Sequence, residues 1–176
     1  LLLFPYYVLA QVEQNKTLLL IKQKDQYTQQ KERKIKEAID LLRVPNASAE
    51  QRYAINQRLF DEFKTYISDS AVYYVKENIR IAEELQKTDL QNDSRLSLAS
   101  LYIISGNYLD AADLLRAIDK NQLQQSQLIQ YYNCYLNLYN NYAFNSPDAK
   151  TYIAKSNTYR DLLLNLVDKN TTHYIL

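Results

Sequence analysis

Glycine and proline are scarce in this chain of 176 residues, which has one glycine and three prolines. A phosphate-binding loop needs several glycines, because its backbone must approach the phosphate closely. Sheet-rich folds need glycine and proline at their many tight turns. The scarcity of both residues therefore excludes a glycine-rich phosphate loop and argues against a β-rich fold.

Cysteine and histidine each occur once, as Cys134 and His173. One cysteine excludes an internal disulfide, and a metal site needs several convergent histidine, cysteine or carboxylate ligands. Neighbouring carboxylates such as Asp61 and Glu62 point about 100° apart on a helix, so they do not form an acid–base pair. We therefore predict that the chain is not an enzyme and uses no metal or cofactor. Cys134 is expected to be a small apolar filler.

Tryptophan and methionine are absent, whereas tyrosine occurs 17 times. Tyrosine can fill helix–helix interfaces while its hydroxyl stays at the edge, so we expect these rings to be packing residues. The alternative is a surface on which a sugar or peptide stacks. The formal net charge of +1 gives no reason to expect nucleic acid or an anionic membrane as a partner.

The two ends of the sequence are apolar. Residues 1–10 are too few to span a bilayer, which needs about 20 apolar residues, but Val8-Leu9-Ala10 resembles a signal-peptide cleavage site. We predict that residues 1–10 are the remnant of a signal peptide. The alternative is that they begin a first core helix. The apolar end at Leu176 suggests a fragment of a longer chain.

Residues 11–176 are expected to form a single helical domain. The pattern predicts a long helix over residues 12–43, whose heptad column is too interrupted for more than a weak coiled-coil seam. Three helical hairpins are predicted at about 48–87, 93–119 and 123–168. Their helix starts are indicated by Ser48 with Gln51, by residues 92–94 and by Ser146 with Pro147.

The middle hairpin has the spacing of a tetratricopeptide-type repeat, in the run LSLASLYIISGNYLDAADLLRAI at 96–118. The matching positions are Leu98, Ala99, Tyr102, Gly106, Tyr108, Ala111 and Leu115. Gly106 is expected to permit the turn that ends the first helix of the pair. The predicted fold is therefore all-α, a tetratricopeptide-like stack of about three helical hairpins preceded by a long N-terminal helix.

The order of segments resembles a particular family. The resemblance rests on 27–32 (YTQQKE) followed by Ile35, on 59–66 (LFDEFKTY) leading into 69–71, and on the glycine hairpin. The chain is similar to the exported, N-terminal tetratricopeptide-like domain of a bacterial family of membrane-anchored regulators. The resemblance implies a place on the periplasmic side of the inner membrane, with a cytoplasmic location as the alternative.

In that family a membrane span and a DNA-binding part would follow later in the chain. The resemblance therefore implies that this fragment binds no nucleic acid and meets the membrane only through a segment outside it.

A polar face is predicted on the first helix of the third hairpin. Its members, at helical spacing, are Gln130, Asn133, Asn137, Asn140 and Asn141. In a tetratricopeptide-like stack the corresponding concave positions of the other hairpins are Gln57, Asp61, Lys64 and Ser100. Carboxamides both donate and accept hydrogen bonds, so this face suits an extended peptide or a glycan. The plain alternative is a solvated helix surface.

We therefore predict a non-catalytic protein-interaction or sensory module of an exported, membrane-anchored regulator, which binds a protein or peptide partner on its concave face. The alternatives are a stand-alone helical-repeat scaffold and a helical glycan-binding protein. Replacing Asn137 and Asn141 by alanine is expected to weaken partner binding without changing the melting temperature.

Overall fold

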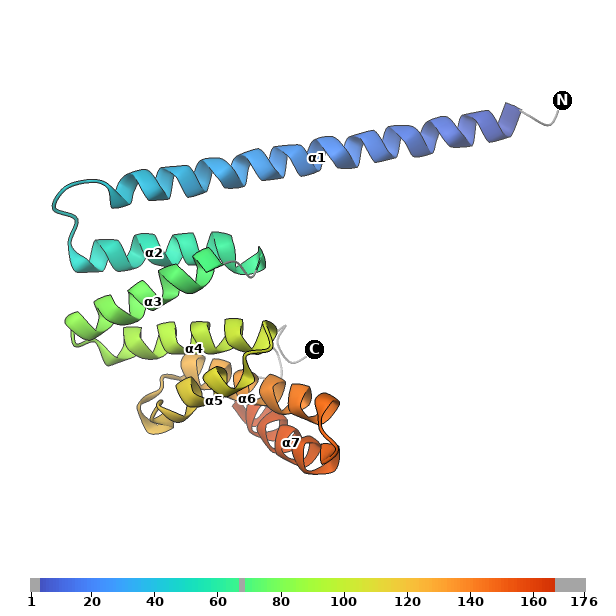
Figure 1. Ribbon diagram of the computed structural model, residues 1–176. Helices are drawn as coiled ribbons and strands as arrows, with labels where there is room; N and C mark the ends of the chain where they lie inside the picture. Colours follow the sequence, from blue (N-terminus) through green and yellow to red (C-terminus); the bar gives the residue numbers. More distant parts are fainter. Residues whose placement is uncertain (1–3, 67–68, 167–176) are drawn as a thin grey trace. The chain divides into compact units, whose positions relative to one another are not determined.

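The computed structural model describes residues 4–66 and 69–166, with the side chains of 16–65 and 69–166. The described residues contain helices and no strand (Figure 1). The chain divides into two compact units, Leu1–Pro45 and Asn46–Leu176, so the single domain expected over residues 11–176 comprises parts of both units.

The first unit contains one helix, α1 (Phe4–Leu42). This helix begins eight residues before the predicted start at residue 12, so residues 4–10 continue it toward the N-terminus. Their removal as part of a signal peptide stays a prediction. The predicted stop is confirmed, because α1 ends just before Val44 and Pro45, and a residue that precedes proline is disfavoured in the α conformation.

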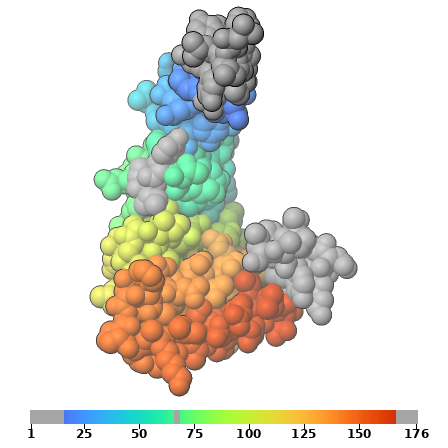
Figure 2. Space-filling view, turned by 90° about the vertical axis from the view of Figure 1, so that its right-hand side faces the viewer, coloured from blue at the N-terminus to red at the C-terminus, as the bar shows by residue number. Residues whose placement is uncertain are grey.

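The second unit contains three helical hairpins that follow one another (Figure 1). They are α2 (Ala49–Phe63) with α3 (Asp69–Glu84), α4 (Thr88–Ile104) with α5 (Tyr108–Arg116), and α6 (Gln125–Asn145) with α7 (Ala149–Leu166). Short 3-10 turns, η1 (Lys64–Tyr66) and η2 (Lys120–Gln122), follow α2 and α5. Helix α4 packs on α3 and α6, α6 packs on α7, and Figure 2 shows the yellow-green surface of this part of the chain bordering the orange surface of α6. The predicted all-α stack of hairpins is confirmed.

Two of the predicted helix starts need comment. Ser48 caps α2 as expected, because its hydroxyl accepts from the Gln51 N–H while the Gln51 side chain accepts from the Ser48 N–H. The start predicted at 92–94 is wrong, because α4 begins at Thr88. Asn92 and Ser94 lie buried inside the helix, where Ser94 Oγ shares a hydrogen bond of 3.0 Å with the Tyr53 hydroxyl of α2.

The last helix, in contrast, starts later than predicted. Ser146 Oγ accepts a hydrogen bond of 3.1 Å from the Asp148 N–H, as a start signal would, but α7 begins at Ala149. Ser146 itself has an extended backbone after the end of α6. The serine therefore forms a short side-chain turn between the two helices.

Gly106 ends α4 as predicted. Its φ angle is +84°, and the next N–H, that of Asn107, donates to the Tyr102 carbonyl at 2.8 Å. This is the Schellman arrangement, in which a left-handed residue closes the helix end. The α3 end has the same bond pattern with Gln86 (φ +54°) in place of glycine, since the Lys87 N–H donates to the Ala82 carbonyl at 3.0 Å.

The core of the second unit joins the hairpins. Its largest cluster lies between the second and third hairpins and includes Leu96, Ala99, Leu115 and Leu138, none more than 1% exposed. The repeat positions Leu98, Ala99, Ala111 and Leu115 are buried, while Tyr102 and Tyr108 are half-buried against this cluster. Cys134 is buried in it as the expected filler.

Candidate functional site

The carboxamide face on α6 consists of Gln130, Asn133, Asn137, Asn140 and Asn141. Two of these residues hold α6 against its neighbours. Asn141 Oδ1 accepts a hydrogen bond of 3.1 Å from the Tyr108 hydroxyl of α5, and Asn140 Oδ1 accepts one from Ser156 Oγ of α7. These two side chains therefore have a structural role.

The other three residues of the carboxamide face remain available. Asn137 is exposed, and Gln130 and Asn133 are half-buried. No side-chain hydrogen bond between described residues engages these three amides. Their spacing of i, i+3 and i+7 keeps them along one side of α6.

The predicted residues on the earlier hairpins behave differently. Asp61 and Lys64 are exposed and form an ion pair of 2.7 Å with each other, while Lys64 Nζ also lies 5.6 Å from the centre of the Phe60 ring. Gln57 Oε1 lies 3.5 Å from the Asn78 amide nitrogen of α3, and Ser100 is half-buried. Within 4–66 and 69–166, no hydrogen bond or ion pair joins these four residues to the carboxamide face. A common concave site that these four residues share with the carboxamide face therefore stays a prediction.

The alignment of α6 with α4 explains why its face is polar. Tyr102 and Tyr139 are 37 positions apart, and the same offset matches Leu96 with Asn133 and Ile103 with Asn140. Leu96 and Ile103 are buried in the cluster that receives α6. Helix α6 therefore has amides where α4 has the apolar side chains on which the next hairpin packs, a pattern typical of a polar outer repeat.

Besides the carboxamide face, the third hairpin has a groove of about 520 Å³ between α6 and α7. The helical spacing of residues in the sequence did not predict this groove. This tyrosine groove is lined by Tyr131, Tyr132, Tyr139, Lys155, Thr158, Tyr159 and Leu162, with Lys120 from η2. The abundance of tyrosine was the only signal for it in the sequence. The two lysines come from distant segments, so no local pattern could bring them together.

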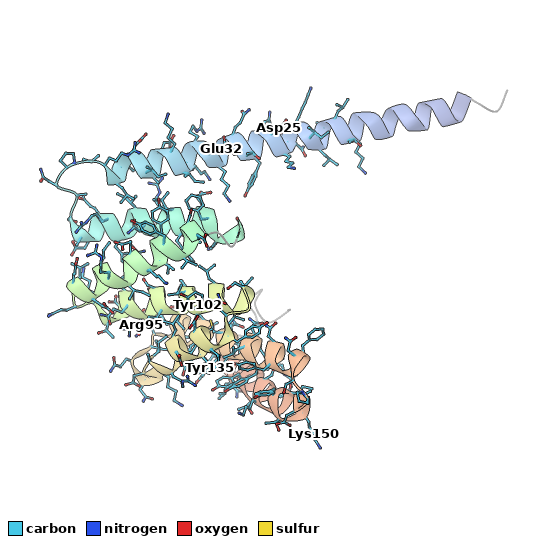
Figure 3. The ribbon with its side chains drawn as sticks, in the orientation of Figure 1. Asp25, Glu32, Arg95, Tyr102, Tyr135 and Lys150 are labelled. Carbon is cyan, nitrogen blue, oxygen red and sulfur yellow. The ribbon has the colours of Figure 1, made fainter. Side chains whose placement is uncertain are left out.

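The tyrosine rings behind the groove form a packed array. Tyr135 and Tyr159 stack with ring centres 4.6 Å apart, and Tyr159 stacks on Tyr139 at 5.7 Å. Figure 3 shows Tyr135 among the rings of this region. Tyr131, Tyr132 and Tyr135 are each 8% exposed, whereas Tyr139 and Tyr159 are half-buried. The array thus serves as helix packing and, at its edge, as an aromatic wall.

The electrostatic character of the groove is positive. Lys155 Nζ lies 5.4 Å from the Tyr139 ring centre and 5.6 Å from that of Tyr152, within the range of cation–π attraction. Burial raises the pKa of Tyr131, and raises that of Tyr159 to about 12. These phenols therefore stay uncharged at neutral pH. Among the residues that the structure describes, no aspartate or glutamate lines the groove.

Catalytic chemistry finds little support in this geometry. Burial raises the pKa of the Cys134 thiol to about 12, so it stays protonated and unreactive. Across the described ranges there is no group of three or more histidine, cysteine or carboxylate side chains placed to hold a metal ion. His173 lies outside the described residues.

Among the helices the structure describes, none combines the length and apolar character needed to cross a membrane.

Comparison with known families identifies the fold. The sequence model of the SusR N-terminal TPR domain matches residues 21–176. The match confirms the predicted likeness to a tetratricopeptide-like N-terminal domain of a regulator family. Neither the curated proteins nor the solved structures include a match to this chain.

Proposed function

The chain belongs to the SusR N-terminal TPR domain family, and from this premise we propose that it is the partner-binding module of an exported regulator. TPR domains are scaffolds whose repeats present surfaces for binding. The observation that carries the proposal is the set of three free carboxamides on α6, those of Gln130, Asn133 and Asn137. Membership of a regulator family favours this function over a stand-alone scaffold.

The geometry of these amides suits an extended peptide. Residues 130 and 137 are seven positions apart on a helix, which places them about 10 Å from each other along its axis. An extended peptide advances about 3.3 Å per residue, so three residues of a partner cover the same length. Each carboxamide can donate to a backbone carbonyl and accept from a backbone N–H.

We place this binding on the periplasmic side of the inner membrane. Residues 1–10 would then be the end of a signal peptide, and a span beyond this fragment would anchor the regulator. A partner that binds one arrangement of the hairpins more tightly than another shifts the population toward it. That shift is the event that the regulator would transmit.

The test uses the full-length regulator in its own cells. A photoreactive amino acid at Asn137 is expected to cross-link one partner, which mass spectrometry then identifies. The double variant Asn133→Ala with Asn137→Ala should reduce the recovery of that partner at unchanged expression. A matched control is Lys150→Ala, an exposed residue of α7. Equal recovery from the double variant and the control would contradict the proposal.

A further inference from the structure

The tyrosine groove has a composition that fits one class of ligand. Its floor and walls offer aromatic faces, one leucine and phenol hydroxyls, and its charged groups are the ammonium groups of Lys120 and Lys155. The volume of about 520 Å³ falls within the range of small-ligand pockets. A ligand for this groove therefore combines an apolar or aromatic part with negative charge.

Within the part of the chain that the structure describes, both lysines lack an acidic partner. Among the described residues, neither Lys120 nor Lys155 forms an ion pair, although other basic side chains of the chain pair with acidic ones, such as Lys64 with Asp61 and Lys87 with Glu50. Lys155 instead lies over the rings of Tyr139 and Tyr152. A cation–π contact at an exposed site is weaker than a charge-assisted hydrogen bond to a carboxylate, so an incoming carboxylate can take over this ammonium group.

The lining also argues against a neutral sugar as the ligand. Sugar hydroxyls need many side-chain acceptors, and the lining residues that the structure describes include no carboxylate and no carboxamide. Burial raises the pKa of Tyr131 and of Tyr159, so these phenols stay neutral, and no described lining residue carries a negative charge to offset the two lysines.

We infer that the tyrosine groove between α6 and α7 is a binding site for a short acidic peptide segment that carries aromatic or other apolar side chains between its carboxylates. The apolar side chains stack on Tyr139 and Tyr159, and the carboxylates pair with Lys120 and Lys155. This site is separate from the carboxamide face, because its lining includes none of the five residues of that face.

Isothermal titration calorimetry on the full chain tests this inference. The probe is the capped peptide Ac-Glu-Phe-Glu-Phe-NH2, and its neutral counterpart is Ac-Gln-Phe-Gln-Phe-NH2. We expect the acidic peptide to bind at least about tenfold more tightly than the neutral one, because the neutral peptide lacks the charge-assisted hydrogen bonds to the lysines. Raising the salt concentration should weaken the binding of the acidic peptide, because salt screens the attraction between exposed charges.

Three variants make the result specific. Lys155→Gln and Lys120→Gln should each lower the affinity for the acidic peptide by about tenfold. Lys150→Gln, on the same helix but outside the groove, should leave binding unchanged, and melting temperatures verify that all three variants are folded. Equal affinity of the two peptides, or no effect of Lys155→Gln and Lys120→Gln, would overturn the inference. So would binding of an acidic oligosaccharide, such as a trimer of galacturonic acid, in place of the peptide.

A further variant separates this site from the proposed function. Asn133→Ala with Asn137→Ala should leave binding of the acidic peptide unchanged, because neither residue lines the groove. Loss of peptide binding in that variant would place the peptide on the carboxamide face and overturn the assignment to the groove.

Discussion

At the scale of single residues, Gly106 and Gln86 both end a helix in the left-handed conformation, although only Gln86 has a side chain. Both occupy the left-handed position of a Schellman helix end, at φ angles of +84° and +54°. A Cβ atom added at Gly106 would meet no atom within 4 Å, so any cost there comes from the backbone conformation alone. Residues other than glycine pay roughly 1 kcal/mol for that conformation.

These two positions give paired predictions. Gly106→Ala should lower the free energy of unfolding by about 1 kcal/mol, and Gln86→Gly should raise it by up to about 1 kcal/mol. Gly106→Asn should cost less than Gly106→Ala, because asparagine tolerates the left-handed region. Urea unfolding of the three variants measures the differences. An unchanged midpoint for Gly106→Ala would disprove the assigned role of this glycine.

Cys134 and the buried tyrosines predict how stability depends on pH. The pKa of Cys134 and that of Tyr159 are both raised to about 12 in the folded chain, above the values of about 8.5 and 10 for free side chains. When the pKa of a group is higher in the folded chain than in the unfolded chain, its contribution to folding stability is complete at pH values below the unfolded-state pKa. The contribution is lost as the pH rises from the unfolded-state pKa to the folded-state pKa, because the unfolded chain then releases its proton first. The melting temperature should therefore be constant near neutral pH and fall from about pH 8.5 upward.

The same burial predicts the reactivity of the thiol. Cys134 is 4% exposed, so a thiol reagent at pH 8 should modify it only when the chain unfolds. Labelling at increasing urea concentration should follow the loss of helical circular dichroism. Rapid labelling of the native chain would show that the packing around Cys134 is wrong.

At the scale of helices, the N-terminal half of α4 is fixed from both sides. The Tyr53 hydroxyl of α2 donates to the Leu90 carbonyl at 3.2 Å and shares a hydrogen bond with Ser94. Gln127 Nε2 of α6 donates to Asp93 Oδ1 at 2.7 Å and to the Asp89 carbonyl at 2.9 Å. These bonds set the register of successive hairpins, because each requires one particular alignment of the two helices.

A double-mutant cycle on the first of these contacts is informative. Tyr53→Phe and Ser94→Ala should each lower the free energy of unfolding by about 1 kcal/mol. The double variant should cost less than their sum, because both single changes remove the same bond. Chemical denaturation of the four proteins gives the coupling energy. Strict additivity would mean that the bond contributes nothing.

Two residues of the carboxamide face, Asn137 and Asn141, should also respond differently to substitution. Asn141→Ala leaves the Tyr108 hydroxyl without its acceptor and should cost about 1 kcal/mol, whereas Asn137→Ala, at an exposed amide, should cost under about 0.5 kcal/mol. Melting temperatures distinguish them. This replaces the expectation from sequence that both changes leave melting unaltered.

The predictions from sequence succeeded where the cause was local. Ser48 and Gln51 cap each other within four residues, and Gly106 ends its helix through its own backbone, so both could be predicted. The start at 92–94 was wrong because a buried serine that bonds to another helix has the same sequence pattern as a capping serine. Asn140 and Asn141 were predicted to belong to a partner-binding face, but their side chains bond to Ser156 of α7 and to Tyr108 of α5, contacts that no local pattern could predict.

At the scale of the whole molecule, the second unit depends on contacts between hairpins. Leu115 of α5 is fully buried in the cluster that joins the second and third hairpins. Leu115→Ala should lower the free energy of unfolding by about 2–5 kcal/mol. Leu109→Ala, at a position 77% exposed on the same helix, is the control and should change it by less than about 0.5 kcal/mol. Comparable effects of both variants would contradict the assigned core.

The tyrosine array has a spectroscopic consequence. With no tryptophan in the chain, near-ultraviolet absorption and emission come mainly from tyrosine. Among the tyrosines whose side chains the structure describes, eight form one connected set of ring contacts: Tyr108, Tyr131, Tyr132, Tyr135, Tyr139, Tyr142, Tyr152 and Tyr159. Their chromophores are close enough to couple, so the natural optical signal of this protein is weighted toward its third hairpin. Binding of a ligand at the third hairpin should therefore change the intrinsic tyrosine fluorescence, so it can be followed without an added dye.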